Sequence, residues 1–296
     1  MSDASWPVYV TTAADAAAPA ARRRAAILGQ VENVYFALTE TFNRDGPIVV
    51  LASGQAVVYH RIAMMSKDGD WIVQETMQAC TRVMAELAAR GARYRPGAPL
   101  DVRWLSGGWS SHFEFADDRR RRIRCDFVSR PPRVPMALVD EMFRHPGREP
   151  LAAVDPHTLI LLKQTQRAKD YAVIAELARR LPPEQEIALT TDPDRVLALA
   201  PEVGASSARP AVRAALAGDG RIAVVTALAV EADGLQQRDR RRVARYQRAA
   251  EPYLAECRRL GLFEAPLSDA HARLCEVAAQ WLPQGVGEEA GDGHAE

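Results

Sequence analysis

Ile48-Val49-Val50-Leu51-Ala52-Ser53-Gly54-Gln55-Ala56, followed along the chain by Asp68-Gly69-Asp70-Trp71-Ile72-Val73, is the part of the sequence that decides the fold. The first run has the β-branched apolar residues of a short buried strand. Its Ser-Gly pair leads into an apolar segment, 56–62, that has the character of a helix. The second run predicts another strand. Together they predict a strand, a small-residue turn, a helix and a second strand that opens with two acids.

The two acids are the first chemical signal. Residues two apart on a strand project to the same side, so Asp68 and Asp70 would present two carboxylates together. Adjacent anions repel one another, and Mg²⁺ suits such a pair because it prefers carboxylate oxygens and substrate phosphate. Ser53 and Gly54 are small enough to let backbone N–H groups approach a phosphate. An isolated Asp-x-Asp pattern also occurs in ordinary turns and solvated loops, and that alternative stays open.

A third acid lies further along the chain. Trp109–Phe115 and Ile123–Val128 predict a hairpin, because a short polar turn joins two alternating apolar runs. Asp126 sits in the second of these runs, where an acid is costly unless it is paired or bound to metal. It is therefore a third candidate carboxylate. The alternative is a simple ion pair with Arg124 or Arg130.

The remaining segments are mostly helical in character. Apolar residues recur at helical spacing over 14–43, and residues 239–260 predict another helix. Residues 102–105 predict one further strand before the hairpin. The last segment, 285–296, is rich in Gly and Glu and is expected to be a disordered tail.

One helix carries candidate ligands for phosphate. Asp155 as N-cap and Pro at the first helical position predict a helix start, and the apolar pattern continues to about Leu181. Lys163, Arg167 and Asp170 would then share one face of this helix. The functional interpretation puts Lys163 near a triphosphate, and the alternative is a solvated face with a local ion pair.

Composition excludes several classes of protein. The 296 residues hold 38 Lys+Arg and 38 Asp+Glu, so the chain as a whole is not a basic nucleic-acid scaffold. No apolar run approaches the ~18 residues of a membrane span, and no secretory signal is recognisable. The four cysteines stand far apart, which predicts reduced thiols in a cytoplasmic protein. P-loop, H-E-x-x-H and G-x-S-x-G motifs are missing from the sequence.

These patterns predict an α+β fold with a small mixed sheet flanked by helices and a helical C-terminal half. The expected organisation is an N-terminal helical segment (1–45), a sheet-containing core (46–150), a helical C-terminal domain (151–284) and the tail (285–296).

The order of these motifs resembles the polymerase-β-type nucleotidyltransferase superfamily. In that family a small-residue turn follows a strand, an Asp-x-Asp or Asp-x-Glu pair comes next, and a third Asp lies on a later strand. Residues 66–70 are similar to the common Thr-x-Asp-Ile-Asp form. Residues 159–170 resemble the helix that follows the core in AbiEii-like bacterial toxins. The positions that carry the resemblance to the core are Ser53, Gly54, Asp68, Asp70 and Asp126.

The resemblance implies a metal-dependent nucleotidyltransferase that moves a nucleotidyl group from an NTP to an acceptor hydroxyl and releases pyrophosphate. It implies that Mg²⁺ (or Mn²⁺) is bound by three catalytic carboxylates and that a nucleotide such as ATP is bound at the turn and a lysine. The implied metal ligands are Asp68, Asp70 and Asp126, and the implied phosphate contacts are Ser53, Gly54 and Lys163. Resemblance to the toxins also suggests tRNA as acceptor and a cognate antitoxin as partner, although another acceptor fits equally well, and no membrane is involved.

Two other hypotheses remain open from the sequence. Gly69 replaces the apolar residue that is usual between the two acids, which motivates a catalytically inactive nucleotidyltransferase-like binding or regulatory module. In the third hypothesis, a helical interaction protein, the acids are incidental and do not meet.

Overall fold

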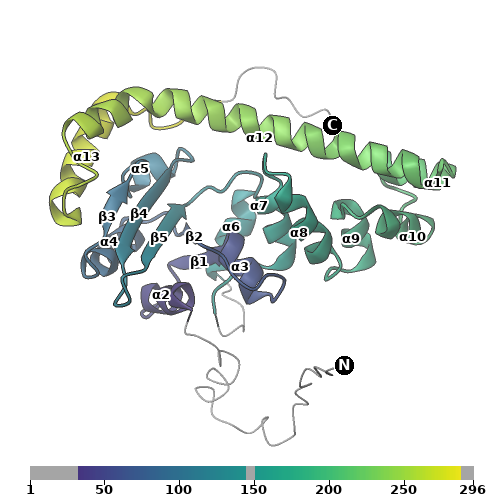
Figure 1. The fold of residues 1–296 in the computed structure, drawn as a ribbon, viewed down its shortest axis with the longest axis horizontal. Helices are drawn as coiled ribbons and strands as arrows, with labels where there is room; N and C mark the ends of the chain where they lie inside the picture. Colours follow the sequence, from purple (N-terminus) through teal and green to yellow (C-terminus); the bar gives the residue numbers. More distant parts are fainter. Residues whose placement is uncertain (1–32, 145–150, 288–296) are drawn as a thin grey trace, which may run out of the picture.

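The computed structural model describes residues 33–144 and 151–287 (Figure 1). All of its strands precede the long helical second half. The strands are β1 (Val49–Ala52), β2 (Gly69–Val73), β3 (Arg93–Arg95), β4 (Ser110–Ala116) and β5 (Arg122–Val128). The helices are α2 (Val34–Phe42), α3 (Ser53–Tyr59), α4 (Met77–Ala88), α5 (Val102–Leu105), α6 (Met136–Arg144), α7 (Pro156–Lys163), α8 (Lys169–Ala178), α9 (Pro183–Leu189), α10 (Pro193–Val203), α11 (Pro210–Ala217), α12 (Gly220–Arg259) and α13 (Leu267–Trp281).

The strands form one sheet in the order β1-β2-β5-β4-β3. β1 is antiparallel to β2, β2 runs parallel to β5, and β4 is antiparallel to both β5 and β3. The sheet is therefore mixed, and helices flank it before the chain becomes helical throughout. The predicted α+β fold, with its small mixed sheet and its helical second half, is confirmed.

One face of the sheet carries a large aromatic core. Trp71 and Phe127 are neighbours on β2 and β5, and their rings stack with centroids 5.2 Å apart. Phe42 of α2 packs edge-on against both rings. Buried side chains from α4, α5, α13 and the C-terminal part of α12 complete this core. Apolar and polar residues alternate along β4 and β5 because every second side chain of each strand is buried in this core.

The opposite face is only half covered. Val50 of β1 and Ile72 of β2 are buried in a second apolar cluster beneath α3, α7 and α8. On the neighbouring strands, Asp126 of β5 and His112 of β4 are partly exposed. The sheet therefore presents a polar, partly open surface beside a sealed apolar one.

The segment after residue 150 is tied to the sheet by backbone hydrogen bonds. Leu51 N–H donates to Ala152 O at 2.8 Å, and Val154 N–H donates to Leu51 O at 2.9 Å. The expected domain boundaries, including the one at 150/151, stay predictions.

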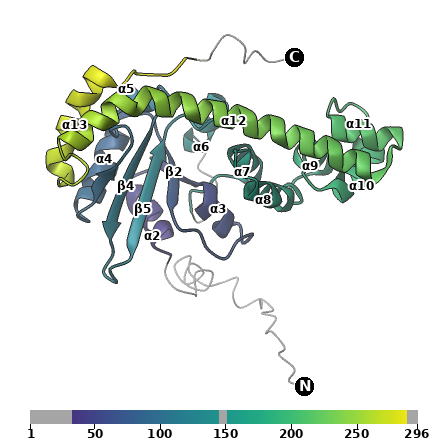
Figure 2. The ribbon, with the colours of Figure 1, turned by 45° about the horizontal axis from the view of Figure 1, so that its top comes forward.

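Helix α12 links the two ends of the molecule. It runs from α11, beside α10, across to α13 (Figures 1 and 2). Along this path Tyr246 Oη donates to Gly107 O at 2.9 Å and Tyr253 Oη donates to Gly97 O at 3.2 Å. Among the described helices, α12 included, none is both long and apolar enough to cross a membrane.

Two sequence predictions about local structure are wrong. Residues 102–105 form the short helix α5 rather than a strand, because Asp101 caps the helix by accepting from Arg103 N–H at 2.8 Å. The expected helix from Asp155 to Leu181 is broken between α7 and α8. There Gln166 and Arg167 give their N–H groups to side chains instead of the helix ladder.

The remaining predictions of local structure concern the hairpin, the other helices and the tail. The hairpin of β4 and β5 is confirmed, and residues 239–260 lie largely within α12. Strand β3 was missed, because three residues are too short a run to show a clear period. The predicted helix over 14–43 is observed as α2, and its earlier part lies outside the described residues, as does most of the predicted tail.

Candidate active site

A row of polar side chains crosses the half-open face of the sheet. Strand pairing places Ala52 opposite Asp70, Asp70 beside Asp126, Asp126 opposite His112, and His112 opposite Arg95. Residues directly opposite one another across a ladder project to the same face. The register therefore brings two of the predicted acids together on adjacent strands.

Asp70 is an acid without a counter-charge in contact with it. Within the described residues, its side chain takes part in neither a hydrogen bond nor an ion pair. Burial and the neighbouring Asp126 carboxylate raise the pKa of Asp70 from its ordinary value of 3.8 to about 7. Lys163 and Arg167 lie near enough to oppose this rise, but they do not overcome it. A carboxylate held in this state favours the arrival of a cation.

Asp126 already has two partners. Its Oδ1 atom lies 3.1 Å from Arg95 Nη1 and 2.8 Å from His112 Nδ1. Its Oδ2 atom accepts no hydrogen bond from the described residues and stays available to a ligand. The alternative considered from the sequence, an ion pair of Asp126 with Arg124 or Arg130, is wrong, because both arginines pair with other acids. Arg124 lies 3.6 Å from Asp68, and Arg130 pairs with Glu75 at 2.7 Å.

Asp68 stands at the entrance to β2, in a loop that is fixed on two sides. Gln55 Nε2 donates to Ser66 O at 2.9 Å, and Tyr35 Oη donates to Lys67 O at 2.6 Å. The Oδ1 atom of Asp68 is shielded from solvent and accepts no hydrogen bond within the described part of the chain. Arg124 Nη1 lies 3.6 Å from this oxygen as an ion-pair partner without donating a hydrogen bond, so the oxygen can still accept from a bound ligand or hold a cation.

The predicted phosphate turn lies at the end of β1. Ser53 begins α3 with a left-handed backbone, φ 48°. A side chain at Gly54 would collide with Ser66 Oγ, so packing against the loop already requires glycine here. Because Ala52 is opposite Asp70, the Ser53–Gly54 turn adjoins the carboxylate row.

Lys163 is held in place by a buried acid. Its side chain is only 8% exposed, and Nζ lies 3.4 Å from Asp170 Oδ1. Asp170 Oδ2 accepts from Thr165 Oγ1 at 2.7 Å and from Arg167 Nε at 3.0 Å. Lys163, Arg167 and Asp170 therefore meet as the sequence predicts, but they do so around a turn rather than along one helical face. The turn lies close enough to the sheet for both cations to act on Asp70.

Asp239 of α12 supports this turn and was not predicted to do so. It is 3% exposed, its Oδ2 accepts from Gln166 N–H at 3.0 Å, and its Oδ1 accepts from Arg133 Nη1 at 2.8 Å. Arg133 in turn donates to Leu161 O at the end of α7. In the sequence Asp239 lies between Arg238 and Arg240, and nothing in that pattern indicates a buried acid.

The residues present fit a divalent cation in one specific way. Within residues 33–144 and 151–287, no group of three or more His, Cys, Asp or Glu side chains is arranged to hold a metal ion. Mg²⁺ often uses only one or two protein carboxylates and keeps water and substrate phosphate as its other ligands. The side-by-side pair of Asp70 and Asp126 suits that mode of binding. So does the Oδ1 atom of Asp68, which accepts no hydrogen bond within the described residues.

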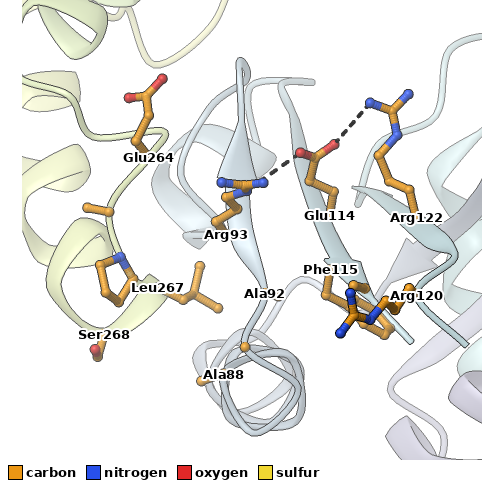
Figure 3. Close-up of a pocket in the computed structure, with 14 residues that line it drawn as sticks. Ala88, Ala92, Arg93, Glu114, Phe115, Arg120, Arg122, Glu264, Leu267 and Ser268 are labelled. Carbon is orange, nitrogen blue, oxygen red and sulfur yellow. Dashed lines mark ion pairs between the residues drawn. The ribbon is translucent and has the colours of Figure 1, made fainter. Parts of the chain in front are cut away.

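A separate cavity of about 640 Å³ lies at the far edge of the sheet, between β3–β4 and the start of α13 (Figure 3). None of the three predicted acids lines it. In Figure 3 the Glu114 carboxylate points between Arg93 and Arg122, at 3.6 Å and 3.9 Å. The Glu114 carboxylate is therefore paired with two arginines.

The structure therefore brings Asp70, Asp126, Lys163 and the Ser53–Gly54 turn around one part of the sheet. It also adds side chains that sequence reasoning missed, namely Arg95, Ser110 and Asp239. Arg95 was missed because β3, at three residues, is too short a run to show a clear period in the sequence.

Comparisons with known proteins add little to this picture. No family model and no curated protein matches the sequence. A candidate nucleotidyltransferase from H. pylori is similar in structure at 13% identity, with a TM-score of 0.35, over 70% of this chain and 94% of that one. JHP933 from Helicobacter pylori is similar at 12% identity, with a TM-score of 0.36, over 71% and 93%. These scores are too low to carry an argument, and the resemblance to AbiEii-like toxins stays a prediction.

Proposed function

We propose that this chain is a metal-dependent nucleotidyltransferase whose site lies on the half-open face of the sheet. The observation that carries the proposal is the pairing of Asp70 with Asp126. Asp70 has a pKa of about 7, and none of the described residues places a counter-charge in contact with it. Two adjacent carboxylates and a buried lysine are the groups that a metal-bound triphosphate requires.

Each residue has a distinct role in this proposal. Asp70 and Asp126, with Asp68 beside them, would hold Mg²⁺ or Mn²⁺. The bound metal would neutralise charge on the triphosphate and on the oxygens that attack and leave the α-phosphorus. Lys163 adds positive charge on the α7 side of the site.

Two further parts of the site complete the reaction. Ser53 and Gly54 would place backbone N–H groups against the β- and γ-phosphates. Asp126 would also accept the proton of the acceptor hydroxyl through Oδ2, the oxygen not used by Arg95 and His112.

The test is pyrophosphate release by the full chain with Mg²⁺ and each of the four NTPs, with and without a tRNA mixture as acceptor. We expect release with at least one NTP and a loss of about 100-fold or more in Asp70→Asn and Asp126→Asn. Asp45→Asn, which changes an exposed acid, is the matched control and should behave as wild type. Equal release by wild type and Asp70→Asn would contradict the proposal.

A binding module without catalysis is the second candidate. Arg95 lies against Asp126 and already supplies part of the charge that a metal would bring, which favours this alternative. In the sequence, Gly69 was the reason to consider a binding module. The structure gives Gly69 a role in packing, because a side chain there would collide with the rings of Trp71 and Tyr35. Calorimetry distinguishes the two: nucleotide binding that depends on Asp70, with no pyrophosphate from any NTP, would favour the binding module.

The acceptor, the choice of nucleotide, a cognate antitoxin and a cytoplasmic location remain predictions from the resemblance and from composition. The tRNA arm of the assay addresses the first of them. A dependence of pyrophosphate release on added tRNA would support tRNA as the acceptor.

A further inference from the structure

Ser110, His112 and Asp126 form a chain of contacts on the polar face, and the function above uses only the carboxylate of this chain. Ser110 Oγ lies 3.0 Å from His112 Nε2, and His112 Nδ1 lies 2.8 Å from Asp126 Oδ1. A hydroxyl, an imidazole and a carboxylate in this order are the nucleophile, the base and the orienting group of nucleophilic catalysis. The Nδ1 contact has the length of a hydrogen bond without its alignment, which is common before substrate binds.

The imidazole is confined to this arrangement by its neighbours. A side chain at Gly97 would collide with His112 Cδ2, so the ring lies directly against the backbone at Gly97. That backbone is fixed in turn, since Gly97 O accepts from Tyr253 Oη of α12 and Ala98 N–H donates to Ser110 O at 3.0 Å. The histidine is therefore preorganised between the serine and the carboxylate, and its side chain remains 26% exposed.

The serine stands on a definite side of the carboxylate pair. Asp70, Asp126 and His112 occupy successive strands, so His112 lies beyond Asp126 as seen from Asp70. Two strand spacings, about 10 Å, separate the ends of this row, a distance that a nucleoside triphosphate can span. The Ser53–Gly54 turn follows β1 and Ser110 lies on β4, so the two flank the carboxylate pair from opposite sides. An acceptor hydroxyl would approach from the Ser110 side.

We propose that Ser110 is itself a nucleotidyl acceptor, so that the enzyme modifies its own chain. This inference rests on the proposed function and names one acceptor for it. The Ser110 oxygen attacks the α-phosphorus of the bound NTP, the bond to the bridging oxygen of the β-phosphate breaks, and pyrophosphate leaves. For this acceptor the hydroxyl proton passes to His112 Nε2, which contacts Ser110 Oγ, rather than to Asp126, and the product is a nucleotidyl-serine phosphodiester.

The neighbouring serine provides a matched control. Ser111 lies on the opposite face of β4, is fully buried, and makes no hydrogen bond through its hydroxyl within the described residues. Ser111→Ala therefore removes a serine of the same strand without touching the polar row. Ser110→Thr keeps a hydroxyl and suits a strand, because β-branched residues are well tolerated there.

The experiment is intact-mass and peptide mass spectrometry of the full chain after incubation with Mg²⁺ and each NTP, with pyrophosphate release measured in parallel, with and without a tRNA mixture. We expect one nucleotidyl group per chain on Ser110 in wild type, Ser111→Ala and Ser110→Thr. We expect none in Ser110→Ala, and an initial rate at least about 100-fold lower in His112→Gln. Thermal unfolding of each variant verifies that it is folded.

The two possible failures are distinguishable. Pyrophosphate release that depends on Asp70 with Ser110 unmodified, or modified equally in His112→Gln, would overturn this inference and leave the proposed function standing. No pyrophosphate with any NTP, with or without tRNA, would overturn both.

Discussion

Two acids in this protein, the half-buried Asp70 of the sheet and the buried Asp239 of α12, have opposite surroundings. Asp239 is surrounded by donors: Arg133, Arg242 and the N–H of Gln166. Burial raises the pKa of Asp239, but these partners outweigh burial and hold it below its usual range. Among the residues that the structure describes, Asp70 has no such partner, and its pKa rises to about 7. An acid with all its partners supports the fold, whereas an acid left without them indicates a ligand.

The largest expected effect is on stability at the helical junction. Asp239→Ala would leave Arg133 without its buried partner and should cost about 3–5 kcal/mol of the free energy of unfolding. Chemical denaturation at pH 7 measures it. Asp233→Ala, which changes an exposed acid on the same helix, should stay within about 0.5 kcal/mol of wild type. If Asp239→Ala changed the free energy of unfolding as little as Asp233→Ala, the structural role assigned to Asp239 would be contradicted.

Asp70→Asn should raise the free energy of unfolding, whereas Asp239→Ala should lower it. A carboxyl whose pKa is raised in the folded state stabilises the protein only when protonated, and this contribution is lost as pH rises through about 7. Removing the charge should therefore stabilise the metal-free protein by about 2–4 kcal/mol at pH 8, the upper figure corresponding to the full rise in pKa. The gain should fall toward zero near pH 4, where the carboxyl is protonated in wild type as well. Denaturation curves across this range, recorded in EDTA, measure it, and a gain that is independent of pH would contradict the assignment.

Metal binding should depend on pH for the same reason. Mg²⁺ at ten times its dissociation constant should stabilise wild type by about 1.4 kcal/mol at pH 8. The effect should shrink at pH 6, because the ion must displace a proton from Asp70. Thermal unfolding with MgCl₂ against matched KCl measures the effect. A full Mg²⁺ effect in Asp70→Asn would place the ion elsewhere.

The smallest effect belongs to the cavity at the sheet edge. Arg120 lies at the tip of the hairpin and lines the cavity, far along β5 from the carboxylate pair. Arg120→Ala should change the free energy of unfolding by less than about 0.5 kcal/mol and leave the Mg²⁺ effect intact. Loss of the stabilisation by Mg²⁺ in this variant would show that the cavity takes part in metal binding.

The local patterns were the predictable part of this molecule. Strand β2 and the hairpin follow from alternation and turn residues, and the register that places Asp126 beside Asp70 agrees with the expected order of motifs. The break between α7 and α8 was not predictable, because it depends on Asp239, which lies far away along the chain and takes the N–H of Gln166. The contacts of His112 with Ser110 and Asp126 likewise require knowledge of which strands are neighbours.

The most direct test of the central claim is to locate the ion. A crystal of the full chain grown with Mn²⁺ and a non-hydrolysable NTP analogue would show the metal by anomalous scattering. We expect an anomalous peak bound by the carboxylates of Asp70 and Asp126, with the triphosphate extending toward Ser53 and Lys163. A nucleotide bound elsewhere, or a metal that avoids both carboxylates, would contradict it.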